Sequence, residues 1–466
     1  MNYKKLTPAI IEELKTITGE NYVFSDAENL ENYSRDETED LSFLPEVVVK
    51  PRTAGEISKI LLLCNREFIP VTPRGGGTGL SGGALPVFGG IIISMERFNS
   101  ILLIDERNLQ ATVEPGVINQ VFQDAVMEKG LFYPPDPASR GSCFLGGNLA
   151  ECAGGPKAVK YGVTKDYVLN IETVLPTGEI IWTGANVLKN STGYNLTQLM
   201  IGSEGTLGII TKIVLKLIPF PNQNLLMLVS FLSAEKACEA VSAVFMAGIT
   251  PSAMEFMERD AIDYVLQFVD VTMKIKDEIK AHLIIEVDGN DIDVLFKECE
   301  KISGIMYSYE CDEVLLADTA QQKAALWKMR RAAGEAVKSH SIYKEEDTVV
   351  PRAELPVLLK GVKAIGNKYG FRSVCYGHAG DGNLHVNIIK ENMSDEDWNN
   401  KVPPGIREIF QLCVSLGGTI SGEHGIGWVQ KDYMDIPFNK TQIHLQKGIK
   451  KLFDPNMILN PGKIFN

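Results

Sequence analysis

An α+β fold of two domains is the architecture that this sequence predicts. From residue 45 to residue 218, short runs rich in β-branched residues alternate with glycine and proline, and helical patterns interrupt them at 54–67 and 118–130. A turn-forming segment at 220–224 follows, and strand and helix patterns then alternate over 225–330. Short strands that are bounded by turn residues and interleaved with helices are typical of sheets covered by helices.

The first domain is expected over residues 1–220, with its core at 41–220, and the second over 221–415. In the first domain we expect strands at 46–50, 68–71, 90–95, 101–104, 111–116, 170–176, 179–184 and 206–219. In the second domain we expect an antiparallel sheet with helices on one face, built from strands at 225–232 and 281–289 and helices at 233–248, 258–270, 291–302 and 319–340. Residues 404–466 are expected to be helical apart from two glycine-rich loops.

Composition excludes several classes of protein. The chain has 466 residues and a formal charge of −13, which argues against a nucleic-acid partner. No run reaches the roughly 18 apolar residues that a membrane helix needs. The eight cysteines are scattered without a CxxC pair, which argues against an iron–sulfur cluster, a thiolate zinc site and a disulfide framework. The N-terminal residues are predicted to form a short amphipathic helix rather than a signal peptide, so a cytoplasmic location is expected.

A glycine-rich loop, Pro-Arg-Gly-Gly-Gly-Thr-Gly-Leu-Ser-Gly-Gly at 73–83, follows a predicted strand. Consecutive glycines leave backbone N–H groups free to converge on phosphate oxygens. Residues 77–82 satisfy GxGxxG, but the glycines and proline between 82 and 90 leave no room for the helix that a Rossmann dinucleotide site requires. Alone, the loop could equally be plain turn structure.

Further glycine turns follow in order at 134–139, 146–150, 153–155, 160–162 and 202–208. With these motifs, the region resembles the FAD-binding domain of the vanillyl-alcohol oxidase/p-cresol methylhydroxylase superfamily, in which such loops wrap an extended FAD between two subdomains. The resemblance implies that Arg74, Gly75, Gly76, Gly77, Thr78, Gly79 and Ser81 hold the pyrophosphate. It places Pro135, Asp136, Ser139, Gly147, Asn148, Gly154, Tyr161 and Gly162 along the flavin, Ile210 near the adenine, and Asn460 among the cofactor-binding residues. Relatives with covalent flavin often carry histidine where this chain has Thr78, so non-covalent FAD is expected.

Three of the six histidines stand in two short motifs. Residues 376–388 read as strand, glycine turn, strand, and a period of two places His385 and Asn387 on one face while the turn can fold His378 back towards them. The second motif is Ser-Gly-Glu-His-Gly-Ile-Gly at 421–427. Two imidazoles and a carboxylate make a three-ligand site with open positions, the form expected of a catalytic metal. A core histidine or an exposed turn would explain either motif alone, and the pairing favours the metal.

Both motifs resemble the D-2-hydroxy-acid dehydrogenase branch of the superfamily, which includes D-lactate dehydrogenase, glycolate oxidase catalytic subunit and D-2-hydroxyglutarate dehydrogenase. The resemblance implies that His378, His385 and Glu423 bind zinc or a similar divalent ion, and that His424 is the catalytic base. It assigns Arg330, Lys344 and Asn387 to substrate binding. A planar guanidinium suits a carboxylate better than an ammonium group does. A simple ion pair on a helix surface remains the alternative for Arg330.

The resemblance covers nearly the whole chain and implies that the C-terminal segment, 416–466, returns to the FAD domain. The implied reaction is oxidation of a small D-2-hydroxy acid, D-lactate or glycolate, to the 2-oxo acid, with hydride transfer to the flavin. Gly334 stands where the hydroxyglutarate enzymes have a hydroxyl residue, which leaves that substrate as an alternative. No second redox motif is present, so the electrons would pass to an external acceptor: an iron–sulfur subunit, an electron-transfer flavoprotein, a cytochrome or a quinone.

Other functions and assembly states stay open at this point. The same fold could serve an oxygen-using oxidase or an alkylglycerone-phosphate synthase, and the Glu-His pair disfavours the synthase. A flavoprotein subunit that only relays electrons is a rival of another class, and it would not need a metal site. A homodimer is open as well.

Overall fold

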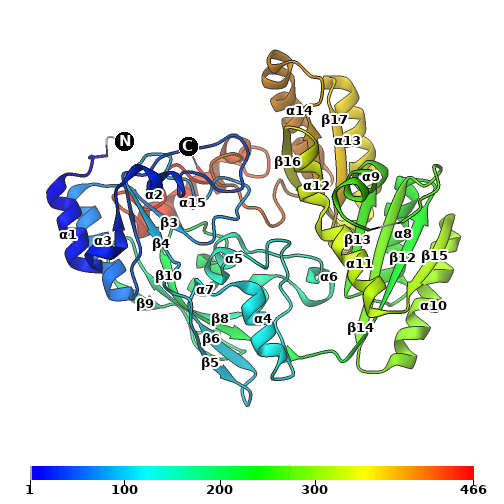
Figure 1. Cartoon of the computed structure of the whole chain (residues 1–466), viewed down its shortest axis with the longest axis horizontal. Helices are drawn as coiled ribbons and strands as arrows, with labels where there is room; N and C mark the ends of the chain where they lie inside the picture. Colours follow the sequence, from blue (N-terminus) through cyan, green and yellow to red (C-terminus); the bar gives the residue numbers. More distant parts are fainter. Residues whose placement is uncertain (1–2, 272, 466) are drawn as a thin grey trace. The chain divides into compact units, whose positions relative to one another are not determined.

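The computed structural model describes residues 3–271 and 273–465, and the chain divides into two compact units (Figure 1). Unit 1 is composed of residues 1–153, 163–220 and 423–466. Unit 2 is composed of residues 154–162 and 221–422. Both units combine helices with sheets, so the predicted α+β class is confirmed.

Unit 1 contains two main sheets. The four-stranded sheet has the order β1 (Val23–Phe24), β2 (Val47–Val49), β4 (Ile91–Ser94) and β3 (Val71–Arg74), with β2, β4 and β3 parallel. The five-stranded antiparallel sheet has the order β5 (Ile101–Asp105), β6 (Gln110–Val113), β10 (Ile209–Lys216), β8 (Val168–Val174) and β9 (Ile180–Trp182). The short strands β7 (Leu131–Phe132) and β11 (Ile218–Pro219) form a separate pair.

Helix α3 (Ala54–Glu67) contacts the five-stranded sheet and shares a core with the four-stranded one. Its N-cap is Thr53, whose hydroxyl accepts a hydrogen bond from the N–H of Glu56. The buried side of the helix includes Ile57, Ile60, Leu61 and Cys64. The helix ends at Phe68, which adopts the left-handed conformation with φ of 59°. For that reason the strand predicted at 68–71 starts only at Val71.

The other helices of unit 1 are α1 (Pro8–Thr18), α2 (Ala27–Glu31), α4 (Asn119–Met127), α5 (Leu145–Glu151), α7 (Leu196–Met200) and α15 (Lys440–Phe453). After α15 the chain returns to the four-stranded sheet, where Leu459 forms a bridge with Val71. Ile458 and Leu459 are buried in the same core as α3. Residues 458 and 459 therefore lie beside the strand that leads into the glycine-rich loop.

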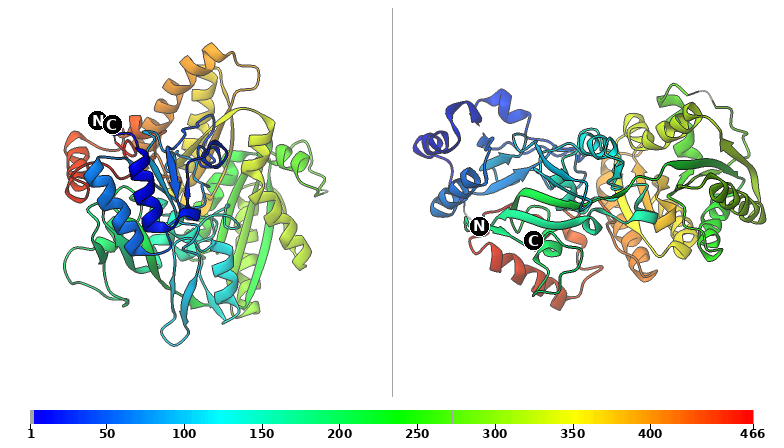
Figure 2. Two further views of the ribbon diagram at one scale, coloured as in Figure 1. Left: turned by 60° about the vertical axis from the view of Figure 1, so that its left-hand side comes forward. Right: turned by 90° about the horizontal axis from the view of Figure 1, so that it is seen from below.

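Unit 2 is organised around one seven-stranded antiparallel sheet with helices on both faces, whereas the sequence predicted helices on one face only (Figure 2). Its order is β15 (Cys311–Ala317), β12 (Gln223–Phe231), β14 (Ala281–Gly289), β13 (Ala253–Glu258), β17 (Arg372–Gly377), β18 (Asn383–Ile389) and β16 (Tyr343–Val349). One face packs against α9 (Arg259–Phe268), α11 (Ala320–Arg331) and α12 (Ala333–His340). The other helices are α6 (Ala158–Tyr161), α8 (Ala234–Met246), α10 (Ile292–Ser308), α13 (Leu355–Tyr369) and α14 (Asp395–Ser415).

The structure corrects three sequence-based expectations. The helix predicted over 319–340 is two helices, which separate at Ala332. Strand β13 was not predicted at all, although it lies in the middle of the sheet. In the C-terminal part, α14 and α15 are the α-helices among the described residues, and the segment between them contains only a 3-10 turn, Lys431–Tyr433. Among the described residues, no helix is both long and apolar enough to cross a membrane.

Candidate active site

Two histidines meet on one face of the sheet in unit 2. His378 follows the end of β17, and His385 lies on β18, opposite Tyr376. The turn between the strands passes through Gly382 at φ of 85°, where a Cβ atom would lie 2.0 Å from the carbonyl oxygen of Val350. The turn brings the two imidazole rings to a centroid distance of 5.4 Å, nearly perpendicular at 82°. The predicted strand–turn–strand arrangement is therefore present.

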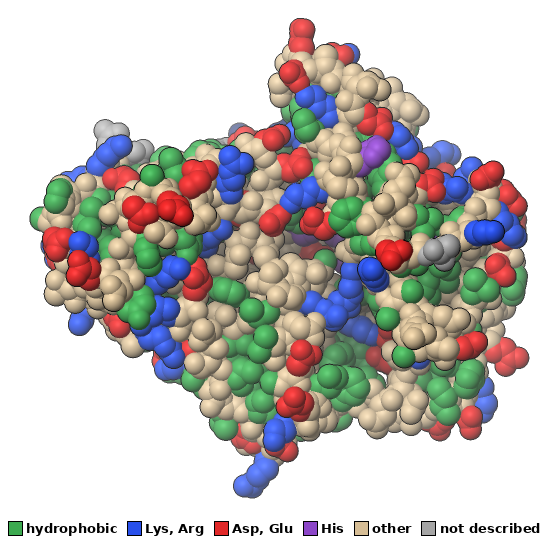
Figure 3. Space-filling view, in the orientation of Figure 1, with side chains coloured by type: hydrophobic (Ala, Val, Ile, Leu, Met, Phe, Trp, Pro, Cys, Tyr) green, Lys and Arg blue, Asp and Glu red, His purple; other side chains and the backbone are tan. Residues whose placement is uncertain are grey.

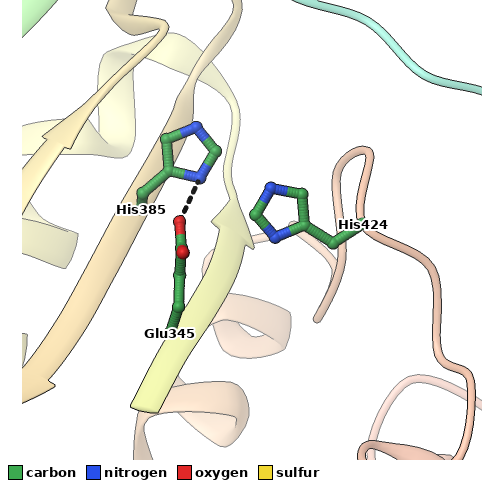
Figure 4. A group of neighbouring side chains, drawn as sticks. All are labelled: Glu345, His385 and His424. Atoms are coloured by element: carbon green, nitrogen blue, oxygen red, sulfur yellow. Dashed lines mark ion pairs between the residues drawn. The ribbon is translucent and has the colours of Figure 1, made fainter. Parts of the chain in front are cut away.

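Each of these imidazoles has a carboxylate next to its Nδ1 atom. The Nδ1 atom of His378 lies 2.9 and 2.8 Å from the two carboxylate oxygens of Glu255. The Nδ1 atom of His385 lies 3.5 Å from Glu345, a contact that Figure 4 marks with a dashed line. The same atom lies 3.7 Å from Asp347. A carboxylate at Nδ1 fixes the orientation of a histidine ring and leaves Nε2 for a metal, which is common around metal sites. The donor set thus fits a divalent ion held by histidine.

Glu255 is fully buried at the centre of this cluster. Burial by itself would raise the pKa of its carboxyl group, but the neighbouring His378 and Arg330 outweigh burial and leave the pKa below the ordinary value of 4.5. The carboxylate therefore stays ionised. Because it touches both a histidine and an arginine, it connects the candidate metal ligands to the candidate substrate cation.

The second motif, residues 421–427, begins with two residues that Asp347 binds within unit 2. Asp347 is buried on β16, and its Oδ2 accepts the N–H of Gly422 at 2.7 Å and the hydroxyl of Ser421 at 3.2 Å. A Cβ at Gly422 would lie 2.6 Å from a methyl group of Val349, so no larger residue fits. The next two residues in the chain are Glu423 and His424.

Two groups of side chains have the spacing that a metal ion requires. The candidate ligand atoms of His378, His385 and Glu423 all lie within 4.8 Å of one another. The same holds for Glu345, His385 and His424, which Figure 4 shows together. The first group is the ligand set that the sequence motifs predicted. The second group shares only His385 with the first. It has Glu345 and His424 in place of His378 and Glu423, and His424 is the residue predicted as the catalytic base.

Arg330 lies at the C-terminal end of α11, buried on the same face of the sheet. Its Nη2 atom is 2.7 Å from Glu255, and its guanidinium lies over the ring of Tyr376 at 5.2 Å. Its buried Nε atom has no hydrogen-bond partner among the described residues. An N–H of this kind is available to an incoming carboxylate. Figure 3 shows acidic and basic side chains interspersed over the face in view, so an anionic substrate needs such a local cation.

The other two predicted substrate residues lie on different faces of the sheet. Asn387 pairs with Glu345 and therefore shares the face of the histidine cluster. It is fully buried; the hydroxyl of Tyr376 is nearby, but neither polar atom of the amide makes a hydrogen bond of good geometry. Lys344 pairs with Ile388, so the strand alternation directs it to the opposite face. The structure brings Asn387, but not Lys344, to the cluster.

Sequence reasoning missed Glu255, Glu345 and Asp347 as members of the site. Glu345 and Asp347 alternate on one strand, which places them on the same face. Glu255 lies between Met254 and Phe256 in the unpredicted strand β13, and all six residues of that strand are buried. A carboxylate inside a short apolar run was the signal that could have found it, because a buried charge needs a partner.

The glycine-rich loop of unit 1 follows β3 and contains no helix between residues 75 and 90. The chain is close-packed at Gly76, where a Cβ would lie 2.6 Å from the carbonyl oxygen of Ser142, yet open at Gly79, where a Cβ would meet nothing within 4 Å. The buried Nη1 atom of Arg74 and the buried hydroxyl of Ser81 have no hydrogen-bond partner among the described residues. An open glycine backbone beside unused donors fits the phosphate groups of a dinucleotide.

Other predicted cofactor residues are divided between the units. Gly75, Gly77, Thr78, Pro135, Asp136, Ser139, Gly147, Asn148, Ile210 and Asn460 belong to unit 1. The amide of Asn460 donates to the carbonyl oxygens of Gly83 and Glu204, which fixes the glycine loop from the C-terminal segment. Gly154, Tyr161 and Gly162 belong to unit 2, where the Tyr161 hydroxyl donates to Asp288 at 2.8 Å.

Comparison with known proteins identifies the family. A model described as FAD linked oxidases, C-terminal domain, matches residues 220–464, and one described as FAD binding domain matches residues 45–184. p-Cresol methylhydroxylase has a similar fold, with a TM-score of 0.81 over 99% of this chain and 98% of that one at 18% identity. An alkyldihydroxyacetonephosphate synthase superposes with a TM-score of 0.76 at 19% identity, covering 99% of this chain and 86% of that one. These two structures show the fold alone.

The chain belongs to the FAD-linked oxidases. Within that family it is an oxidoreductase of the 2-hydroxy-acid dehydrogenase and oxidase group. It is 39% identical to glycolate oxidase subunit GlcD of Bacillus subtilis, over 99% of this chain and 97% of that protein. It is also 39% identical to D-lactate dehydrogenase of Anaerostipes hadrus, over 99% of this chain and 98% of that protein. The D-2-hydroxyglutarate dehydrogenase of Stutzerimonas stutzeri is 33% identical to this chain, over 98% of this chain and 99% of that protein.

Proposed function

We propose that this enzyme oxidises a small D-2-hydroxy monocarboxylate, D-lactate or glycolate, with the help of a divalent metal, zinc or a similar ion. The observation that carries the proposal is the histidine cluster: two imidazoles on one face of the sheet, each with a carboxylate at Nδ1, beside a buried arginine. His378, His385 and Glu423 are the proposed ligands, and Glu345, His385 and His424 are the alternative set.

Each neighbouring side chain has a proposed role in the reaction. Arg330 binds the substrate carboxylate through its unused Nε–H and a second N–H of the guanidinium. His424 removes the proton of the 2-hydroxyl group. Asn387 completes the polar surface against which the substrate lies. When bound, the ion would make the hydroxyl more acidic, and FAD would accept the hydride from C2.

The charges around Arg330 favour a substrate with a single carboxylate. Glu255, Glu345 and Asp347 lie on the same face of the sheet, so that three carboxylates share the face on which Arg330 lies. Gly334 lies near Tyr376, the residue whose ring Arg330 covers: a Cβ at Gly334 would lie 3.4 Å from the Tyr376 hydroxyl. Glycine offers neither charge nor hydroxyl to a second carboxylate. A dicarboxylate such as D-2-hydroxyglutarate, the alternative substrate, would approach this acidic surface unfavourably.

The FAD is proposed to be bound without a covalent link, because Thr78 occupies the position in the glycine loop where a histidine would be required. Arg74, Ser81 and the open backbone at Gly79 are the proposed pyrophosphate contacts. Electrons would leave to an external acceptor. One similar protein is named as a subunit of glycolate oxidase, which supports a partner protein as that acceptor. A subunit that only relays electrons remains the alternative.

The test is a substrate comparison with an artificial dye as the electron acceptor. We expect kcat/KM for D-lactate or glycolate to exceed that for D-2-hydroxyglutarate by at least tenfold, and acid treatment to release all flavin as FAD. The variant Glu345→Gln should reduce this difference in kcat/KM between the monocarboxylates and D-2-hydroxyglutarate, since it removes one negative charge from the acidic surface. A preference for D-2-hydroxyglutarate would refute the proposed substrate class. Absence of activity with all three acids would favour the electron-relay alternative.

A further inference from the structure

The loop that carries Glu423 and His424 is held at its far end by a carboxylate to which neither the motifs nor the proposed function gives a role. Within unit 1, Glu204 accepts the backbone N–H of Ile426 at 2.8 Å and that of Gly427 at 2.6 Å. These are the second and third residues after His424. A carboxylate that accepts two successive backbone N–H groups fixes the path of the chain between them.

Close contacts require glycine at two positions of this loop. A Cβ at Gly425 would lie 2.0 Å from a carboxylate oxygen of Glu151 and 3.1 Å from one of Glu204. A Cβ at Gly427 would lie 2.1 Å from the carbonyl oxygen of Ser81. Both glycines adopt positive φ, at 77° and 53°. The backbone itself, rather than any side chain, is therefore seated against the carboxylates.

Glu204 is held in place from its own side. It adopts φ of 52°, which is unfavourable for a residue other than glycine, so the surrounding structure must determine it. Its N–H donates to the carbonyl oxygen of Ala150, and its carbonyl oxygen accepts the Asn460 amide at 2.8 Å. A residue held this rigidly can transmit its position to what it binds.

The surroundings of Glu204 are charged rather than apolar. Glu151 and Lys463 are close to it, Asp36 is close to both of those residues, and Lys463 also donates to the carbonyl oxygen of Leu85. Burial raises the pKa of Glu204 to about 7 and lowers that of Lys463 to about 7. Burying several ionisable groups is costly, and packing alone does not require it. A functional reason for the cluster is therefore indicated.

We propose that Glu204 is a positioning residue that sets the location of Glu423 and His424 by fixing the backbone that follows them. Asp347 fixes the residue that precedes them, through Gly422. Together the two carboxylates hold the backbone at both ends of a short glycine-rich segment. The inference rests on the proposed roles of Glu423 and His424.

The first part of the test is hydrogen exchange in the FAD-loaded enzyme, without metal or substrate. In the wild type, the amides of Ile426 and Gly427 should be protected. In Glu204→Gln, the peptide over residues 424–430 should exchange at least tenfold faster, because an amide cannot accept both N–H groups. The control is Glu114→Gln, which alters another buried glutamate that accepts a backbone N–H, that of Ser100 at 2.9 Å. The control should leave that peptide unchanged.

The second part is zinc affinity, measured by competition with a chelating dye. Glu204→Gln should bind zinc about 10- to 100-fold more weakly than wild type and Glu114→Gln, the range typical for residues that support metal ligands. Unprotected amides in the wild type, or equal exchange in Glu204→Gln and wild type, would overturn the inference. Faster exchange spread evenly over unit 1 would do so too, since it would show general loss of stability. If wild type binds no zinc but the exchange result is local, the metal proposal fails while the positioning role stands.

Discussion

The Nδ1 atom of His378 lies 2.8 Å from Oε2 of Glu255, a fully buried carboxylate. The same oxygen lies 2.7 Å from the guanidinium of Arg330. One buried carboxylate thus orients a proposed metal ligand and a proposed substrate-binding residue together. Removing its charge should affect both at once.

The first prediction concerns this carboxylate. Glu255→Gln should weaken zinc binding by about 10- to 100-fold, because the neutral amide is a poorer partner for the histidine ring. Metal affinity by dye competition measures this. Glu258→Gln is the control, since Glu258 lies on the same strand but pairs with Lys363 on the other face. Equal zinc affinity in wild type and Glu255→Gln would contradict the assignment of His378.

The second prediction separates Arg330 from Lys344. Arg330→Lys keeps the charge but loses the two-pronged geometry, so kcat/KM for the hydroxy acid should fall by about ten- to a hundredfold. Lys344→Ala should change it less than twofold, because the strand register places Lys344 on the opposite face. Steady-state kinetics with a dye acceptor measures both. A large effect of Lys344→Ala would restore the role that the sequence resemblance gave it.

The third prediction separates the two neighbours in the returning loop. Glu423→Gln should lower bound metal, and excess metal should partly restore its activity. His424→Ala should keep both metal and FAD but lose about 10²- to 10⁴-fold in turnover, as expected for removal of a general base. Metal analysis, flavin content and turnover are measured on each variant. If His424→Ala loses the metal while His378→Ala retains it, the ligand set shown in Figure 4 is the correct one.

The fourth prediction concerns pH and Glu151. Burial, followed by the charge of Glu204, raises the pKa of Glu151 well above 4.5 in the folded protein. Above pH 4.5 the folded state therefore binds one more proton than the unfolded state, and this group makes wild type less stable as the pH rises. Glu151→Gln does not titrate, so its stability relative to wild type should grow as the pH rises, by at most about 1.4 kcal/mol per pH unit.

Urea unfolding between pH 5 and pH 7 measures this difference. The exposed Glu128→Gln on the surface of unit 1 is the control and should show no such trend. A stability difference for Glu151→Gln that is constant across this pH range would show that the buried carboxyl group ionises normally.

Local patterns in the sequence predicted the fold class and the paired histidines. The glycine turns and the alternation in residues 376–388 depend only on neighbouring residues, and both are present in the structure. The rejection of a Rossmann site also holds, because no helix follows the glycine loop before residue 90. These features need no knowledge of distant contacts.

The missed features depend on contacts between distant strands. Glu255 reaches His378 only because β13 and β17 are neighbours in the sheet, and that pairing spans more than a hundred residues. The role of Lys344 depends on which face of β16 it occupies, which the resemblance alone did not give. Glu204 acts on Ile426 across 222 positions of the chain. Sequence proximity carries no signal for such pairs.

The most direct test of the account is an anaerobic titration of the purified enzyme, following loss of the flavin's visible absorbance. D-lactate should reduce the bound FAD, and L-lactate should not, because one base and one metal fix which hydrogen can leave. After treatment with a chelator, reduction by D-lactate should be at least a hundredfold slower, and added zinc should restore it. Equal reduction by both enantiomers, or a rate unaffected by the chelator, would contradict the proposed metal-dependent oxidation of a D-2-hydroxy acid.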